Sequence, residues 1–189
     1  MVILVGGVSC TGKTLMAQKL METYKIPYLS IDHLKMGLIK GLPDCGFQAE
    51  DSSRVIGDKL WPILKGILMT NIENGQNIIM EGCYLLPDLV KQIPPESQDK
   101  IISIYLGFSR NYIEKKLISG MIAHRCVIEQ RGYEESRSRE QLFLEHEELK
   151  QLCQENGANY FEIDMDYETE INRVYEWIDR RMKEAGFLC

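Results

Sequence analysis

The chain has 189 residues, of which 44% are hydrophobic and 26% charged, and its formal net charge at pH 7 is −6. These values are typical of one globular domain with a full core. A net acidic charge argues against general electrostatic binding to nucleic acid or anionic lipid. No apolar stretch reaches the length needed to cross a bilayer. We therefore expect a single domain over residues 1–189 that binds neither nucleic acid nor membrane, with an oligomeric state that composition leaves open.

The six cysteines are scattered along the chain and form no C-x-x-C pair. This spacing indicates neither a zinc site nor a disulfide framework. Reduced thiols fit a cytoplasmic protein best, and we expect that location. The cysteines are Cys10, Cys45, Cys83, Cys126, Cys153 and Cys189.

The first predicted element is a buried parallel strand at Val2–Val5, a short apolar run rich in β-branched residues. The glycine-rich segment that follows matches G-x-x-x-x-G-K-[ST], the phosphate-binding Walker A loop. Good helix formers come next, so the order is strand, loop, helix, as the motif requires. The predicted nucleotide-binding residues are Gly7, Val8, Ser9, Cys10, Thr11, Gly12, Lys13 and Thr14.

Each part of this loop has a chemical task. Glycines allow the backbone to wrap closely, so that successive N–H groups point at phosphate oxygens. Lys13 is expected to reach the β- and γ-phosphates, and the Thr14 hydroxyl to bind Mg²⁺. The alternative is a glycine-rich turn that contains Lys-Thr by chance, which the matching flanks disfavour.

A second strand is predicted at Tyr28–Ile31, followed by Asp32. At the carboxyl end of a parallel strand, this carboxylate is expected near the γ-phosphate, where it accepts the proton of an attacking hydroxyl or helps to position Mg²⁺. Asp is also a favoured helix N-cap, and a helix is expected over His33–Ile39, so a capping role is the alternative.

Further along, apolar residues at helical spacing predict a core-facing helix that starts or kinks near Pro62. The third strand, Asn77–Met80, is followed by Glu81. Glu81 would then take the Walker B position, where an acid holds Mg²⁺ or its water shell. A glutamate facing solvent is the alternative.

The fourth strand is predicted at Ile101–Leu106, ahead of the most highly charged part of the chain. Its four arginines are Arg125, Arg131, Arg137 and Arg139. Phosphoryl transfer needs positive charge on the transferred group, and we expect Arg125 and Arg131 to supply it. Glycines at 120 and 132 are candidate hinges for a lid over about residues 120–140. A solvated helix with Glu–Arg pairs is the alternative.

The fifth strand is predicted at Tyr160–Ile163, and the segment Asp164–Tyr167 after it is expected to border the nucleotide base. A second core-facing helix follows, near the C-terminus. Strands that alternate with helices predict the α/β class, with a parallel sheet covered by helices on both faces.

The Walker A segment, Asp32 and Glu81-Gly82 together resemble the small P-loop kinases. That group includes nucleoside monophosphate, shikimate and gluconate kinases, chloramphenicol phosphotransferase and zeta toxins. The stretch from Glu81 to Pro87 is similar to the E-G-V-H-[LI]-x-P segment of 2-phosphoglycerate kinases, with Cys83-Tyr84 in place of Val-His. The resemblance implies a P-loop NTPase three-layer sandwich with a five-stranded parallel sheet and a helical lid. It also implies Mg·ATP as the phosphate donor.

The sequence thus predicts a kinase that moves the γ-phosphate of Mg·ATP to a small metabolite or nucleotide. In this scheme Lys13, Asp32, Arg125 and Arg131 are catalytic, and Thr14 and Glu81 organise Mg²⁺. A zeta-toxin-like kinase of a nucleotide sugar uses the same residues and stays open. So does a nucleotide-binding regulatory protein without turnover. A GTPase switch is disfavoured, since no N-K-x-D guanine motif occurs.

Overall fold

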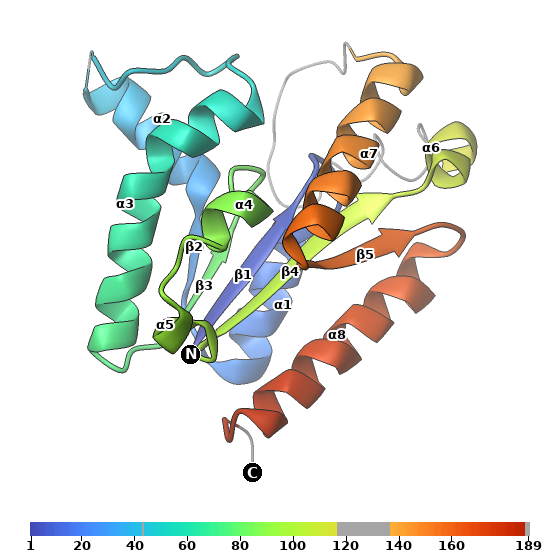
Figure 1. Ribbon diagram of the computed structural model, residues 1–189. Coiled ribbons are helices and arrows are strands. Elements are labelled where there is room, and N and C mark those ends of the chain that lie inside the picture. Colours follow the sequence, from blue (N-terminus) through green and yellow to red (C-terminus); the bar gives the residue numbers. More distant parts are fainter. Residues whose placement is uncertain (43, 117–136, 188–189) are drawn as a thin grey trace.

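The computed structural model describes residues 1–42, 44–116 and 137–187 (Figure 1). Its single sheet has the strand order β2-β3-β1-β4-β5, and every neighbouring pair is parallel. The strands are β1 (Val2–Gly7), β2 (Tyr28–Ser30), β3 (Ile78–Glu81), β4 (Ile101–Phe108) and β5 (Asn159–Ile163). The predicted five-stranded parallel sheet is therefore confirmed.

Helices connect the strands and cover the sheet (Figure 1). They are α1 (Lys13–Tyr24), α2 (Ile31–Gly41), α3 (Ser53–Glu73), α4 (Pro87–Val90), α5 (Pro95–Gln98), α6 (Arg110–Lys116), α7 (Arg139–Asn156) and α8 (Tyr167–Glu184). The helices after β2 and β5 are amphipathic, since their buried residues lie on one stripe.

Alternate residues of the central strand, β1, are buried in two separate hydrophobic cores. Ile3 and Val5 of β1 pack with α1 and α8 on one face. Val2 and Leu4 pack with α3 and the segment around α4 on the other face. All four side chains are at most 1% exposed, because β1 has a neighbouring strand on each side and helices on both faces. This arrangement confirms the three-layer α/β sandwich and fixes the carboxyl end of β1 at the middle of the sheet.

One helix start needs correction, and the structure decides between the two alternatives at Pro62, where the helix continues and changes direction instead of starting. The helix after β2 begins at Ile31, not His33, because Ser30 already has the extended conformation of an N-cap. The helix that contains Pro62 begins at Ser53, capped by the Ser52 hydroxyl, which accepts from the Val55 N–H at 3.3 Å. Apolar burial on both sides of Pro62 holds this helix together despite the missing donor. Figure 1 shows α3 changing direction along its length, the effect expected of an internal proline.

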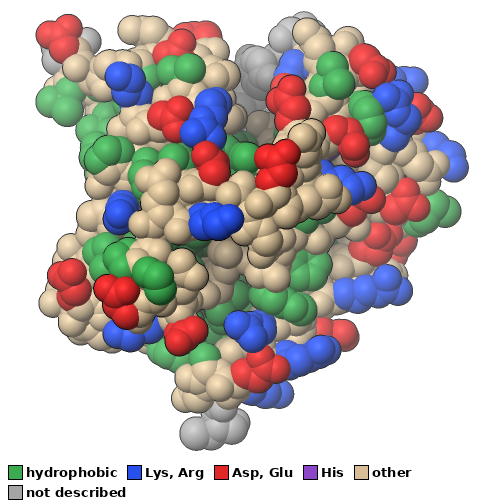
Figure 2. Space-filling view, in the orientation of Figure 1, with side chains coloured by type: hydrophobic (Ala, Val, Ile, Leu, Met, Phe, Trp, Pro, Cys, Tyr) green, Lys and Arg blue, Asp and Glu red, His purple; other side chains and the backbone are tan. Residues whose placement is uncertain are grey.

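The predicted lid falls mainly on residues 117–136, which lie outside the described residues. Within the described residues, no helix is long and apolar enough to span a membrane. On the face shown in Figure 2, basic and acidic side chains are interspersed.

Helix α7 begins with a reciprocal capping box, which should be measurable as stability. The Ser138 hydroxyl accepts from the Gln141 N–H at 3.2 Å, and the Gln141 side chain accepts from the Ser138 N–H at 2.8 Å. We expect Ser138→Ala to lower the free energy of unfolding by about 1 kcal/mol. Urea denaturation measures this. Ser138→Asp, which caps equally well, should stay close to wild type, and equal losses in both variants would contradict the assignment.

Candidate functional site

The segment between β1 and α1 turns sharply at two glycines. Gly7 has φ 142° and Gly12 has φ 85°, conformations that side chains rarely adopt. Space is also short, since a Cβ at Gly7 would lie 2.5 Å from the carbonyl oxygen of Leu106, and a Cβ at Gly12 would lie 1.9 Å from the Tyr167 hydroxyl. Cys10 also takes a left-handed conformation, with φ 66°. The predicted glycine positions are therefore required both by backbone conformation and by close packing.

Lys13 lies within this loop rather than on the surface. It is 7% exposed, and its Nζ donates to the carbonyl oxygen of Val8 at 2.7 Å. The Thr11 hydroxyl donates to the same oxygen at 2.9 Å. Thr14 follows in the first turn of α1 and is half-buried. The start of α1 thus places an ammonium and a hydroxyl together at the positive end of a helix dipole.

Glu81 is the last residue of β3 and is 3% exposed, so the solvent-facing alternative is wrong. It pairs with Val5 of β1 on one side and with Ser30 of β2 on the other. Ile79, two residues earlier, belongs to the core beneath α1, so Glu81 lies on the same face of the sheet as α1. The structure therefore places this buried carboxylate on the strand beside the glycine loop.

Asp32 lies in the first turn of α2, but Ser30 and not Asp32 is the N-cap, so the capping alternative is wrong. Its Oδ1 accepts from the Tyr84 hydroxyl at 3.1 Å and is 3.2 Å from the Lys35 ammonium. Lys35 Nζ in turn donates to the Tyr84 hydroxyl at 2.8 Å. The carboxylate at the end of β2 is thus held from its own helix and from the segment after β3.

These groups fit a magnesium–nucleotide complex by their chemistry. Mg²⁺ prefers hard oxygen ligands, and Thr14 and Glu81 supply a hydroxyl and a carboxylate on adjacent elements. Next to Glu81 in the sheet, the Ser30 hydroxyl is buried without a hydrogen-bond partner among the described residues. A buried hydroxyl rarely stays unsatisfied, so this corner can still accept a water or ion contact.

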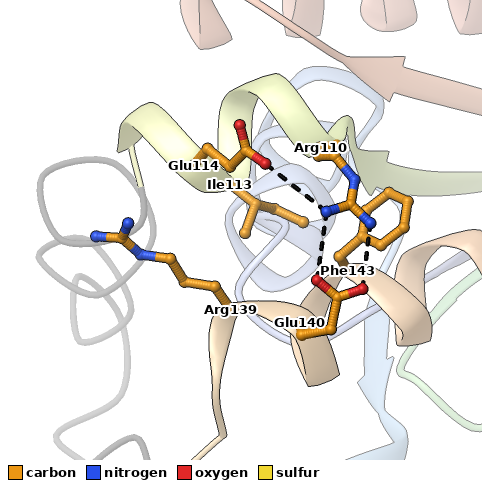
Figure 3. Close-up of a pocket in the computed structure, with 6 residues that line it drawn as sticks. All are labelled: Arg110, Ile113, Glu114, Arg139, Glu140 and Phe143. Carbon is orange, nitrogen blue, oxygen red and sulfur yellow. Dashed lines mark hydrogen bonds and ion pairs between the residues drawn. The ribbon is translucent and has the colours of Figure 1, made fainter.

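The four lid arginines divide into two pairs. Arg125 and Arg131, the two predicted to be catalytic, lie outside the described residues. Arg137 pairs with Glu145 at 2.6 Å, as the Glu–Arg alternative expected. Arg139 lines a cavity of about 320 Å³ between α6 and α7 (Figure 3).

That cavity is lined mainly by groups that already pair with one another. Arg110 stacks over the ring of Phe143 at 3.7 Å and forms ion pairs with Glu114 and Glu140. In Figure 3 the Arg139 guanidinium points away from this cluster. The cavity is therefore a charged surface pocket between α6 and α7, and we assign it no chemistry.

His146 on α7 was not anticipated. It is 0% exposed, and its Nδ1 accepts from the Phe108 N–H at 3.0 Å, so the neutral ring carries its proton on Nε2. Burial, then the positive charges of Lys13 and Arg137, lower the pKa of His146 to about 3. His146 is therefore neutral at physiological pH and adds no positive charge near Lys13.

The segment after β5 packs against the glycine loop. The Tyr167 hydroxyl donates to the carbonyl oxygen of Thr11 at 3.3 Å, and burial raises the pKa of Tyr167 to about 12. The Glu170 carboxylate accepts from three successive backbone N–H groups, those of residues 164–166. That the segment Asp164–Tyr167 borders the nucleotide base stays a prediction. The position of Tyr167 next to Thr11 and Gly12 supports it.

The predicted residues Lys13, Thr14, Asp32 and Glu81 thus lie at one edge of the sheet, and their roles stay predictions. Sequence reasoning missed Lys35, Tyr84 and His146. Lys35 follows Asp32 by three residues, a spacing that places both on one helix face, so the signal was present. Tyr84 lies in the Glu81–Pro87 segment, at the position where the 2-phosphoglycerate kinase pattern has His. No local pattern distinguishes His146 from any other helical histidine.

The chain matches no protein-family model and no curated protein sequence. Solved structures do match over nearly its whole length. A gluconokinase from Sinorhizobium meliloti has a TM-score of 0.60 at 15% identity, covering 98% of this chain and 95% of its own. A shikimate kinase from Aquifex aeolicus has a TM-score of 0.54 at 14% identity, with coverages of 95% and 96%. A sugar kinase from Janibacter sp. has a TM-score of 0.52 at 17% identity, with 94% of each chain covered.

The chain has the fold of the small P-loop kinases. This confirms the fold class expected from the strand–loop–helix motif and the strand order. Identities this low establish the fold alone, so the substrates of those proteins are not carried over.

The neutral state of His146 predicts a specific loss of stability in acid. An unfolded histidine titrates near pH 6.5. Between that pH and about 3, the unfolded chain therefore binds a proton that folded His146 does not. The free energy of unfolding then falls as the pH is lowered through this window, by up to about 1.4 kcal/mol per pH unit. His146→Asn, which retains an acceptor for the Phe108 N–H, should flatten that dependence.

Urea denaturation at several pH values between 4.5 and 7 measures the difference between the two proteins. His33→Asn, which replaces an exposed histidine, is the matched control and should keep the His146-dependent loss. An unchanged slope in His146→Asn would show that the pKa of His146 is not lowered by folding.

Proposed function

We propose that this protein is an ATP-dependent phosphotransferase that moves the γ-phosphate of Mg·ATP to a hydroxyl or phosphate of a small metabolite or nucleotide. One observation carries the proposal. The glycine loop with Lys13, the carboxylate Glu81 and the carboxylate Asp32 stand at the carboxyl ends of three adjacent strands, β1, β3 and β2. Ligands of parallel sheets bind at this edge.

Each group has a role that its position supports. The backbone of the glycine loop and Lys13 hold the phosphates and neutralise charge that develops during transfer. Thr14 and Glu81 would hold Mg²⁺, which when bound screens the repulsion between phosphate and nucleophile. Asp32 orients the acceptor.

In the proposed transfer, one bond to the γ-phosphorus forms as another breaks, and Asp32 takes the proton that is released. The acceptor oxygen forms a bond to the γ-phosphorus while the bond to the β–γ bridging oxygen breaks, and ADP leaves. The proton of the acceptor hydroxyl passes to the Asp32 carboxylate. We propose that Arg125 and Arg131 belong to a lid over about residues 120–140 that excludes water and stabilises the transferred group.

The decisive test measures ADP release from Mg·ATP across a panel of acceptors. The panel holds nucleosides, nucleoside monophosphates, phosphoglycerates, sugar acids, shikimate, aminoglycosides, chloramphenicol and UDP-sugars. We expect one class to stimulate release. We expect Lys13→Ala to reduce turnover at least about a hundredfold, because the loss of an electrostatic contact in the transition state has this size. Lys19→Ala, an exposed lysine on the same helix, is the control.

Stimulation by UDP-sugars would identify the toxin-like alternative. If ATP binds but no acceptor stimulates release, and Lys13→Ala matches wild type, the phosphotransferase proposal fails in favour of a protein that reads nucleotide state.

Asp32→Asn separates acceptor activation from nucleotide binding. The amide keeps the shape of the side chain but is a poor proton acceptor, so turnover should fall about a hundredfold or more. The dissociation constant for Mg·ATP, measured by calorimetry, should change little. Normal turnover with a lowered melting temperature would instead assign Asp32 a purely structural task.

A further inference from the structure

The most unusual feature beside the proposed site is a buried lysine. Lys35 is 8% exposed and Tyr84, which it contacts, is 7% exposed. Burying an ammonium is unfavourable unless its charge is paired and its donors are satisfied. A leucine or methionine at this helix position would pack without that cost. The buried charge therefore calls for an explanation beyond packing.

Lys35 and Tyr84 converge on a single atom, Asp32 Oδ1. The Tyr84 hydroxyl donates to it at 3.1 Å, and the Lys35 ammonium lies 3.2 Å away. The two also support each other, because Lys35 donates to the Tyr84 hydroxyl at 2.8 Å and lies 5.2 Å from the centre of its ring. One carboxylate oxygen is thus fixed by donors from two different elements, α2 and the segment after β3.

This geometry has two consequences for Asp32. A cation within contact distance favours the ionised form of a carboxylate, which is the form that can accept a proton. Two donors on one oxygen also fix the plane of the carboxylate. Such support is what a carboxylate needs in order to meet a reacting hydroxyl in one orientation.

We propose that Lys35 and Tyr84 are positioning residues for Asp32, holding its carboxylate ionised and oriented toward the acceptor hydroxyl. This inference rests on the proposed function, in which Asp32 takes the acceptor's proton. Lys35 does not touch the transferred phosphate in this scheme, and it acts through Asp32.

Among the residues that the structure describes, three other charged side chains at this edge bear on the comparison of variants. Glu81 and Lys13 come from β3 and the glycine loop, and both stay in place in the variants below. Arg54 on α3 is engaged by Asp88 at 2.6 Å. Removal of Lys35 leaves these three charges in place, so the comparison of variants changes only the charge at position 35.

The first test needs no acceptor. Carbon-13 NMR follows the Asp32 carboxyl signal of the full chain against pH, with Asp32→Asn assigning the signal. In Lys35→Met the titration midpoint should rise by about one pH unit or more, and in Tyr84→Phe it should rise less. Lys35→Arg should stay near wild type. Lys40→Met, at an exposed position of the same helix, is the matched control and should leave the midpoint unchanged.

An unchanged midpoint in Lys35→Met would overturn the proposal, whether or not the protein proves to be a kinase. Circular dichroism identifies any variant that fails to fold, and Lys35→Arg then carries the test, because loss of its wild-type midpoint would equally contradict a charge-based role.

The second test uses the acceptor class that the panel identifies. Lys35→Met should lower kcat about tenfold or more, leave Mg·ATP affinity unchanged and move the acidic limb of the pH–rate profile to higher pH. A rise in the acceptor KM alone, with kcat and the pH profile preserved, would overturn the proposal and make Lys35 a direct contact for an anionic acceptor. If wild type shows no turnover, the proposed function fails, while the NMR titration still decides what Lys35 does to Asp32.

Discussion

The turn between β1 and α1 is the constraint on which the rest of the molecule depends. It must reverse direction over a few residues while its backbone passes close to β4 and α8. Gly7 faces the backbone of Leu106, which leaves no room for a Cβ, and Gly12 has a positive φ and faces the hydroxyl of Tyr167. The turn therefore needs glycine for its positive φ angles, and it packs against β4 and α8. Once it is set, α1 starts at Lys13 and the positive end of its dipole lies at the site.

The parallel sheet then determines which side chains meet. Because all five strands run the same way, their carboxyl ends share one edge, and the residues that follow β2 and β3 come to the glycine loop. Several of the charges gathered there are buried, including Lys13, Lys35 and Glu81. Electrostatic interactions are stronger in such surroundings than in water, and each group must find partners. His146 is neutral for the same reason, because its position is buried and Lys13 and Arg137 would repel a third positive charge there.

Local patterns recovered the strands because each is a short apolar run ended by a polar residue or glycine. They were less reliable at helix starts. The Ser52 cap and the apolar stripe outweighed the propensity penalty of Pro62, and α2 began two residues earlier than expected. The candidate site could be predicted where local chemistry favours one residue type, as for Lys13, Thr14, Glu81 and Asp32. Tyr84 and Asp32 are separated by 52 residues, so their contact depends on how β2 and β3 lie side by side.

By itself, the sequence determined the glycine-rich turn of the Walker A motif, the α/β class and the two carboxylates at the ends of β2 and β3. These features are encoded within a few consecutive residues, through glycine conformation, strand periodicity and the chemistry of the side chain that ends a strand. Only the tertiary structure decided that Glu81 is buried, that Asp32 is held by Lys35 and Tyr84, and that His146 lies neutral beside the loop. Those outcomes depend on burial and on contacts between distant segments, because desolvation and pairing of a charge are set by everything packed around it and not by its neighbours in the chain.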